Sequence, residues 1–214
     1  MDVTELCVSF IGVAGALGGT LGGAMLSQRA RKDEDQRAER ERAREREDRA
    51  VQARRDLYAQ INTAARAYRV AARDAVEAAN RGENVDPAHL DTAKEAWAEQ
   101  YSQAQMALTK DVLEVASDLN RALGAGYSVV RSLPGTPDTD VAYRRAKAWF
   151  KGPLSNGVYL LRVTLRHDLG VEDDPHFQHN RAHFLAELNS ARVELERQLA
   201  AERRQGAVRT ARTP

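Results

Sequence analysis

Residues 6–26 read LCVSFIGVAGALGGTLGGAML, a stretch that contains no charged residue, Pro, Asn or Gln. A helix rises about 1.5 Å per residue, so about 20 apolar residues span the roughly 30 Å hydrocarbon core of a bilayer. The acidic Asp2 and Glu5 precede this stretch, whereas a cleaved signal peptide begins with a positive flank. The sequence therefore predicts a retained transmembrane anchor within residues 1–27, with a buried helix of a soluble protein as the alternative.

The charges that flank this stretch predict its orientation in the cell membrane. No Lys or Arg precedes it, whereas Arg29, Arg31 and Lys32 follow it closely. Because positively charged flanks stay in the cytoplasm, we expect the N-terminus outside and residues 28–214 inside. The same three cations are predicted to lie at the membrane surface, near anionic lipid headgroups.

Glycines recur within the apolar stretch at a spacing that allows helices to associate. Gly15, Gly19 and Gly23 are each four residues apart and therefore lie on one side of a helix. Small residues at this spacing let two helix backbones approach closely in lipid. The spacing predicts a homo-oligomer, although glycine is also common in membrane helices that do not associate.

Residues 28–56 alternate acidic and basic side chains and contain no helix breaker. Opposite charges four residues apart support a solvated helix, and they pair Asp33 with Arg37, Arg37 with Glu41, Arg44 with Asp48, and Glu45 with Arg49. Apolar residues are too sparse here for a coiled-coil seam. We therefore expect a charged helical stalk. The interleaved charges and a net charge of +1 predict no specific nucleic-acid partner.

From Leu57 onward, apolar residues recur at helical spacing between short stretches rich in Gly and Pro. The pattern predicts an all-α fold, with an antiparallel helical bundle over residues 57–205 and a disordered tail over residues 206–214. The expected elements are a helix that ends at Gly82, a helix from Pro87 to Gly124 or Gly126, a loop over 127–140, helices over 141–150 and 153–169, and a last helix that starts at Asp174 and Pro175.

The last helix holds the best candidates for metal chemistry. His176, His179 and His183 are predicted to share one helical face, and imidazoles are the commonest metal ligands. The alternative is a polar face that merely contains histidine. The HExxH motif and the paired Glu-x-x-His motifs of di-iron bundles are absent from the chain, as are GxSxG and the phosphate-binding glycine motifs. The sequence therefore assigns no catalytic residue, no cofactor and no metal site beyond these three candidates.

A modest basic cluster surrounds Trp149, formed by Arg144, Arg145, Lys147 and Lys151. Such a cluster can contact nucleic acid or anionic lipid. A solvated helix face is the interpretation that we favour here.

The segment IGVAGALGGTLGG, with QRARK after it, resembles the N-terminal third of small actinobacterial single-pass membrane proteins. Some of those proteins are described as similar to KilB, a plasmid-transfer-associated protein. The resemblance implies a membrane anchor and a role in the transfer of a plasmid or mobile element, and it brings no catalytic residues with it.

Together these patterns predict a non-enzymatic, membrane-anchored cytoplasmic scaffold or adaptor that self-associates and holds an unidentified protein partner near the bilayer. A role in plasmid or mobile-element transfer is one alternative. A metal-binding helical-bundle enzyme that uses His176, His179 and His183 is the other.

Overall fold

The computed structural model describes the backbone of residues 3–83, 87–136 and 139–210, and the side chains of residues 32, 34, 36–83, 87–134, 136 and 139–204. All regular structure in this described part is helical, which confirms the expected all-α class. The elements are α1 (Val3–Asn80), α2 (Pro87–Ala104), α3 (Lys110–Ser132), the short 3₁₀ helix η1 (Leu133–Gly135), α4 (Thr139–Lys151), α5 (Pro153–Asp168) and α6 (Phe177–Thr210).

The chain divides into two compact units, residues 1–53 and 54–214. In α1, every side chain of residues 39–56 is exposed. The predicted pair of Glu45 and Arg49 is present, with 3.7 Å between Arg49 Nη2 and Glu45 Oε2. Arg46 Nε also donates to the Arg42 carbonyl oxygen at 3.1 Å. This part of α1 is therefore a solvated helix that is supported by contacts within itself.

Within the residues whose side chains are described, no helix is long and apolar enough to cross a bilayer. The predicted span over residues 6–26 lies outside those residues, as do Gly15, Gly19, Gly23, Arg29 and Arg31. Lys32 is described and exposed. The anchor and its glycine face therefore stay predictions.

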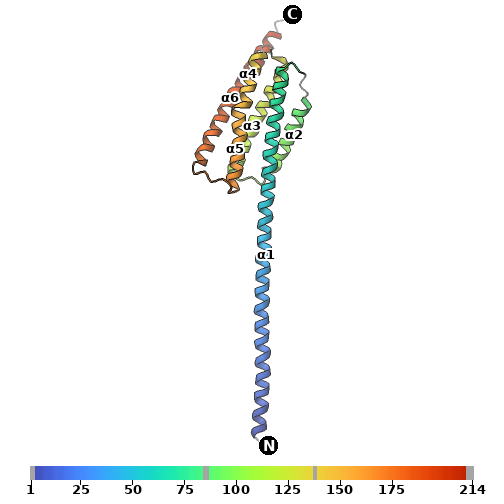
Figure 1. Cartoon of the computed structure of the whole chain (residues 1–214), viewed down its shortest axis with the longest axis vertical. Helices are drawn as coiled ribbons and strands as arrows, with labels where there is room; N and C mark the ends of the chain where they lie inside the picture. Colours follow the sequence, from blue (N-terminus) through green and yellow to red (C-terminus); the bar gives the residue numbers. More distant parts are fainter. Residues whose placement is uncertain (1–2, 84–86, 137–138, 211–214) are drawn as a thin grey trace. The chain divides into compact units, whose positions relative to one another are not determined.

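In the second unit, residues 54–80 of α1 pack with α2 to α6 around an apolar core (Figure 1). The buried side chains of α1 include Tyr58, Ile61, Ala65 and Tyr68, which continue the apolar stripe predicted from the sequence. Tyr68 Oη donates to the Leu123 carbonyl oxygen at 3.4 Å and so joins α1 to α3. Each helix contributes one apolar face, and the bundle forms because these faces are buried together.

Glycine ends two of the helices, as the sequence predicts. Gly82 has φ 72° and Gly170 has φ 66°, a backbone region that L side chains rarely adopt. After α1, the Glu83 N–H donates to the Ala78 carbonyl oxygen at 3.1 Å, and after α5 the Val171 N–H donates to the Arg166 carbonyl oxygen at 2.9 Å. Both glycines therefore close a helix end with a left-handed residue.

The prediction of a single helix from Pro87 to Gly124 or Gly126 is wrong, because the chain reverses direction between α2 and α3. Thr109 is the N-cap of α3 and has an extended backbone, with φ −66° and ψ 161°. Trp97 Nε1 of α2 donates to Asn120 Oδ1 of α3 at 2.8 Å, and Tyr127 Oη donates to Asp91 Oδ1 at 2.8 Å. The start of α2 thus lies beside the end of α3. Folding back buries both apolar faces in one core, which outweighs the local preference for a continuous helix.

The predicted helix stop at Gly124 or Gly126 is also wrong, since α3 continues to Ser132 and occupies part of the predicted loop. A Cβ atom at Gly126 would lie 3.0 Å from Trp149 Nε1 and 3.2 Å from ring atoms of Phe150. The glycine therefore allows close packing between α3 and α4. Sequence alone does not separate this use of glycine from a helix stop.

The helix break at Gly152 and Pro153 is confirmed, because α4 ends at Lys151 and α5 begins at Pro153. The last helix is longer than expected. It reaches Thr210, so the backbone is helical beyond Gly206, and residues 211–214 lie outside the described part.

Candidate functional site

Polar side chains join the first halves of α3 and α6 in matching order along the two helices. Arg181 Nη2 lies 3.3 Å from Asp111 Oδ1, and Arg181 Nη1 also pairs with Glu114. Farther along both helices, Asn189 Nδ2 donates to Asp118 Oδ2 at 2.7 Å. The partners follow the same order from the N-terminus to the C-terminus of both helices. The helices α3 and α6 therefore run parallel, and these contacts fix their register.

Asp118 anchors this contact from a buried position, with its side chain 8% exposed. Asn189 donates to one carboxylate oxygen, and the Arg121 guanidinium donates to the other. A buried carboxylate is costly unless it is paired and hydrogen-bonded, and both conditions are met here. The pairing also positions Arg121 on the outer side of α3.

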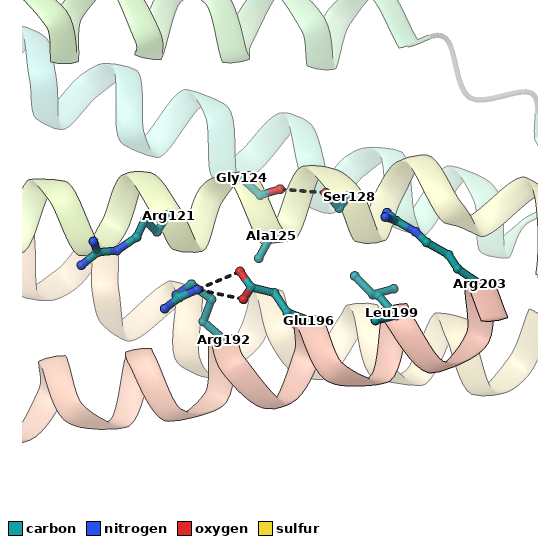
Figure 2. A pocket seen from close by; sticks show the side chains of 9 residues that line it. Arg121, Gly124, Ala125, Ser128, Arg192, Glu196, Leu199 and Arg203 are labelled. Atoms are coloured by element: carbon teal, nitrogen blue, oxygen red, sulfur yellow. Dashed lines mark hydrogen bonds and ion pairs between the residues drawn. The ribbon is translucent and has the colours of Figure 1, made fainter.

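Beyond this contact, α3 and α6 border a groove of about 370 Å³. Figure 2 shows its lining, which comes from these two helices. The lining residues are Arg121, Gly124, Ala125 and Ser128 of α3, and Arg192, Glu196, Leu199, Ala200 and Arg203 of α6. The small residues of α3 leave the space that the longer side chains of α6 border.

Three arginines and one glutamate give this groove an excess of positive charge. Arg192 Nη1 donates to the two carboxylate oxygens of Glu196 at 2.8 and 2.9 Å, in the middle of the view in Figure 2. The Arg192 side chain is 18% exposed, and its Nε is buried without a hydrogen-bond partner in the described part of the chain. Arg121 and Arg203 extend from the two sides of this ion pair in Figure 2.

An ion pair from α4 holds the end of α6 that carries Arg203. Arg145 Nη2 donates to Glu202 Oε2 at 2.9 Å, Arg145 Nη1 pairs with the other carboxylate oxygen, and the Arg145 side chain is only 12% exposed. This contact removes Arg145 from the basic cluster predicted around Trp149, whereas Arg144 and Lys151 are exposed, as expected for a solvated helix face. Arg145 is neutralised by Glu202, and Trp149 is buried in the core.

The three candidate metal ligands do not form a metal site in the structure. His176 immediately precedes the first residue of α6. Its backbone N–H donates to Asp174 Oδ1 at 2.8 Å, and its carbonyl oxygen accepts from the Asn180 N–H at 2.9 Å. His176, His179 and His183 are exposed, and His183 Nε2 lies 3.3 Å from Glu187 Oε1. Among the residues that were described, no group of three or more His, Cys, Asp or Glu side chains could hold a metal ion.

A second polar cluster lies at the end of α5 and joins three helices. Tyr58 Oη of α1 donates to Asp168 Oδ2 at 2.5 Å, and Thr109 Oγ1, at the start of α3, donates to Asp168 Oδ1 at 2.6 Å. Burial, and then the hydrogen bond to Asp168, raise the pKa of Tyr58 above its ordinary value, which keeps the phenol protonated. This cluster is a structural contact. Its members are too far apart in sequence to be recognised by spacing.

Comparisons of this chain with known protein families, with curated proteins and with solved structures find no match. Its function is therefore inferred from its own residues. The fold and the groove define a helical-bundle protein with a candidate binding surface for anionic groups. Sequence reasoning missed Arg121, Arg192 and Arg203, because they are three arginines among many and only the pairing of α3 with α6 brings them together.

Proposed function

We propose that this chain is a non-enzymatic, membrane-anchored adaptor or scaffold whose helical bundle holds a protein partner in the cytoplasm. Residues 6–26 form the span, with the N-terminus outside, and residues 28–56 form a spacer. The observation that carries this proposal is the exposure of every side chain in residues 39–56 of α1. A helix that is polar on all sides has no face to bury in a compact fold, and it suits a bridge through solvent.

The bundle itself supports the adaptor part of this proposal. Its candidate binding surface follows two helices and carries arginines toward both ends, which suits an extended macromolecular segment. The resemblance to plasmid-transfer-associated membrane proteins suggests one setting in which such an adaptor would act.

Self-association is the remaining part of the proposal. The spacing of Gly15, Gly19 and Gly23 supports contact between two spans.

Fractionation of bacterial cells that express the full chain tests the anchor. We expect the chain in the membrane pellet after a carbonate wash, with an N-terminal tag open to external protease and a C-terminal tag protected. Leu17→Arg places a charge within the span, which raises the free energy of membrane insertion by about 2.5–3.5 kcal/mol, and it should move part of the protein to the soluble fraction. Val51→Arg adds the same charge at an exposed position of α1 and should leave the chain in the pellet. Wild-type chain in the cytosolic fraction would disprove the proposal.

A further inference from the structure

We propose that the groove between α3 and α6 docks an acidic peptide segment of a partner protein, with carboxylates at both ends of a short apolar stretch. This inference names the partner chemistry of the adaptor proposed above. It depends on the bundle and not on the membrane anchor.

The spacing of the cations excludes a single small anion as the full ligand. Arg192 and Arg203 are eleven residues apart on α6, which corresponds to about 16 Å along the helix axis. In Figure 2 the guanidinium groups of Arg192 and Arg203 lie on opposite sides of Glu196, so one carboxylate or phosphate does not contact both of them in this arrangement. An extended peptide covers this distance in about five residues, at about 3.3 Å each. The ligand must therefore be extended and carry at least two acidic groups.

Between Glu196 and Arg203 the groove has an apolar part with room for short side chains. Ala125, Leu199 and Ala200 line it between the charged groups. A Cβ atom at Gly124 would meet nothing within 4 Å, so space is open beside the α3 backbone. A ligand with small apolar residues between its carboxylates would match this order of cation, apolar surface and cation.

The arginines keep binding capacity that contacts within the chain do not use. In the described part of the chain, Arg203 is exposed and has no ion pair, and the neighbouring Glu202 is held by Arg145. Arg192 Nε is buried without an acceptor, and a rotation of its guanidinium toward the groove would give this donor a ligand carboxylate. Hydrogen bonds between guanidinium and carboxylate are among the strongest in proteins.

The acidic residues of the site favour a peptide over a nucleic acid. Glu196 lies among the lining residues and Asp118 pairs with Arg121 at its edge. A nucleic-acid backbone carries charge at every phosphate and would be repelled by the central Glu196. Carboxylates placed only at the two ends of a peptide avoid that repulsion.

Fluorescence anisotropy on the full chain in detergent micelles tests the inference. The probe is a labelled peptide with two glutamates, a Leu-Ala-Leu centre and two more glutamates, and the control peptide has glutamine in place of each glutamate. We expect saturable binding of the acidic peptide and at least tenfold weaker binding of the control. Salt should weaken the acidic complex, because its contacts are ionic.

Variants of adjacent arginines show whether the groove is responsible. Arg203→Glu should weaken acidic-peptide binding at least tenfold. Arg204→Glu is the control, because it makes the same charge change one residue farther on. Arg204 does not line the groove, and its Nε donates to the Ala200 carbonyl oxygen. This variant should bind the acidic peptide within twofold of the wild-type affinity. Arg121→Gln, which removes the charge and keeps a polar side chain, should also weaken binding. Circular dichroism confirms that each variant is folded.

Three outcomes would overturn the inference: no saturable binding of the acidic peptide, equal losses in Arg203→Glu and Arg204→Glu, or tighter binding of a DNA oligonucleotide of equal charge. The assay does not require a bilayer. A chain that fractionates with the cytosol would therefore end the anchor proposal alone, and a failed peptide assay would end the docking proposal alone.

Discussion

Asp168 is the residue on which three helices converge. It is the last residue of α5, and a carboxylate at a helix C-terminus is disfavoured by the helix dipole. The hydroxyl groups of Tyr58 and Thr109 each donate to one of its oxygens and offset that penalty. The same hydrogen bonds fix the order of α1, α3 and α5 at this end of the bundle.

A pair of tyrosine substitutions tests this contact. Tyr58→Phe removes a hydrogen bond to a charged group and should lower the free energy of unfolding by about 1.5–3 kcal/mol. Tyr68→Phe is the control, because Tyr68 is equally buried but donates only to a carbonyl oxygen at 3.4 Å, and it should cost less than about 1 kcal/mol. Urea unfolding of the full chain, followed by circular dichroism, measures both values. Equal losses of unfolding free energy in the two variants would contradict a stabilising role of the hydrogen bond from Tyr58 to Asp168.

At the scale of the helices, glycine serves two different purposes in this chain. Gly82 and Gly170 have positive φ and end α1 and α5. Gly126 lies inside α3 and allows the side chains of Trp149 and Phe150 to approach. Glycine thus ends a helix in one place because it can adopt a positive φ, and in another place it lets a neighbouring helix pack closely because it has no side chain.

Two alanine substitutions on α3 separate these uses. Gly126→Ala would overpack the contact with Trp149 and should lower the free energy of unfolding by about 1–3 kcal/mol. Gly124→Ala should raise it by about 0.5–1 kcal/mol, because its Cβ atom meets nothing within 4 Å and alanine favours a helix. Thermal unfolding measures whether each substitution lowers or raises the stability of the chain. A stabilised Gly126→Ala chain would contradict the close packing of α3 on α4.

For the whole molecule, α1 changes character along its length. Its side chains are exposed over residues 39–56, whereas Tyr58, Ile61 and Ala65 shortly afterwards are buried. A single helix therefore presents a charged surface in one part and a core face in another. This division agrees with a spacer that leads into a folded bundle, which is the arrangement that we propose.

Self-association is tested by crosslinking in membranes. Gly19→Leu places a bulky side chain in the glycine row and should reduce the yield of crosslinked dimer severalfold, because close backbone approach is lost. Ala14→Leu is the matched control, since it lies about 140° away around the helix at about 100° per residue, and should leave the yield unchanged. Equal dimer yields from both variants and the wild type would remove the glycine face from the proposal.

Much of the fold could be predicted because its causes are local. Apolar spacing identifies the helices and the all-α class, and glycine marks the ends of α1 and α5. The pair of Glu45 and Arg49 follows from their separation of four residues. The turn before α3 could not be predicted in this way. Residues 105–109 contain no Gly or Pro, and the reversal exists because α2 packs back onto α3.

By itself, the amino-acid sequence determined the helical class, the solvated charged segment and the ends of α1, α4 and α5, because each depends on residues within a turn or two of one another. Only the tertiary structure decided that Gly126 admits Trp149, that Tyr58 and Thr109 meet at Asp168, and that the arginines of α3 and α6 share one groove. These contacts join residues far apart in the chain. Their partners are chosen by the packing of whole helix faces, and local spacing carries no information about that choice.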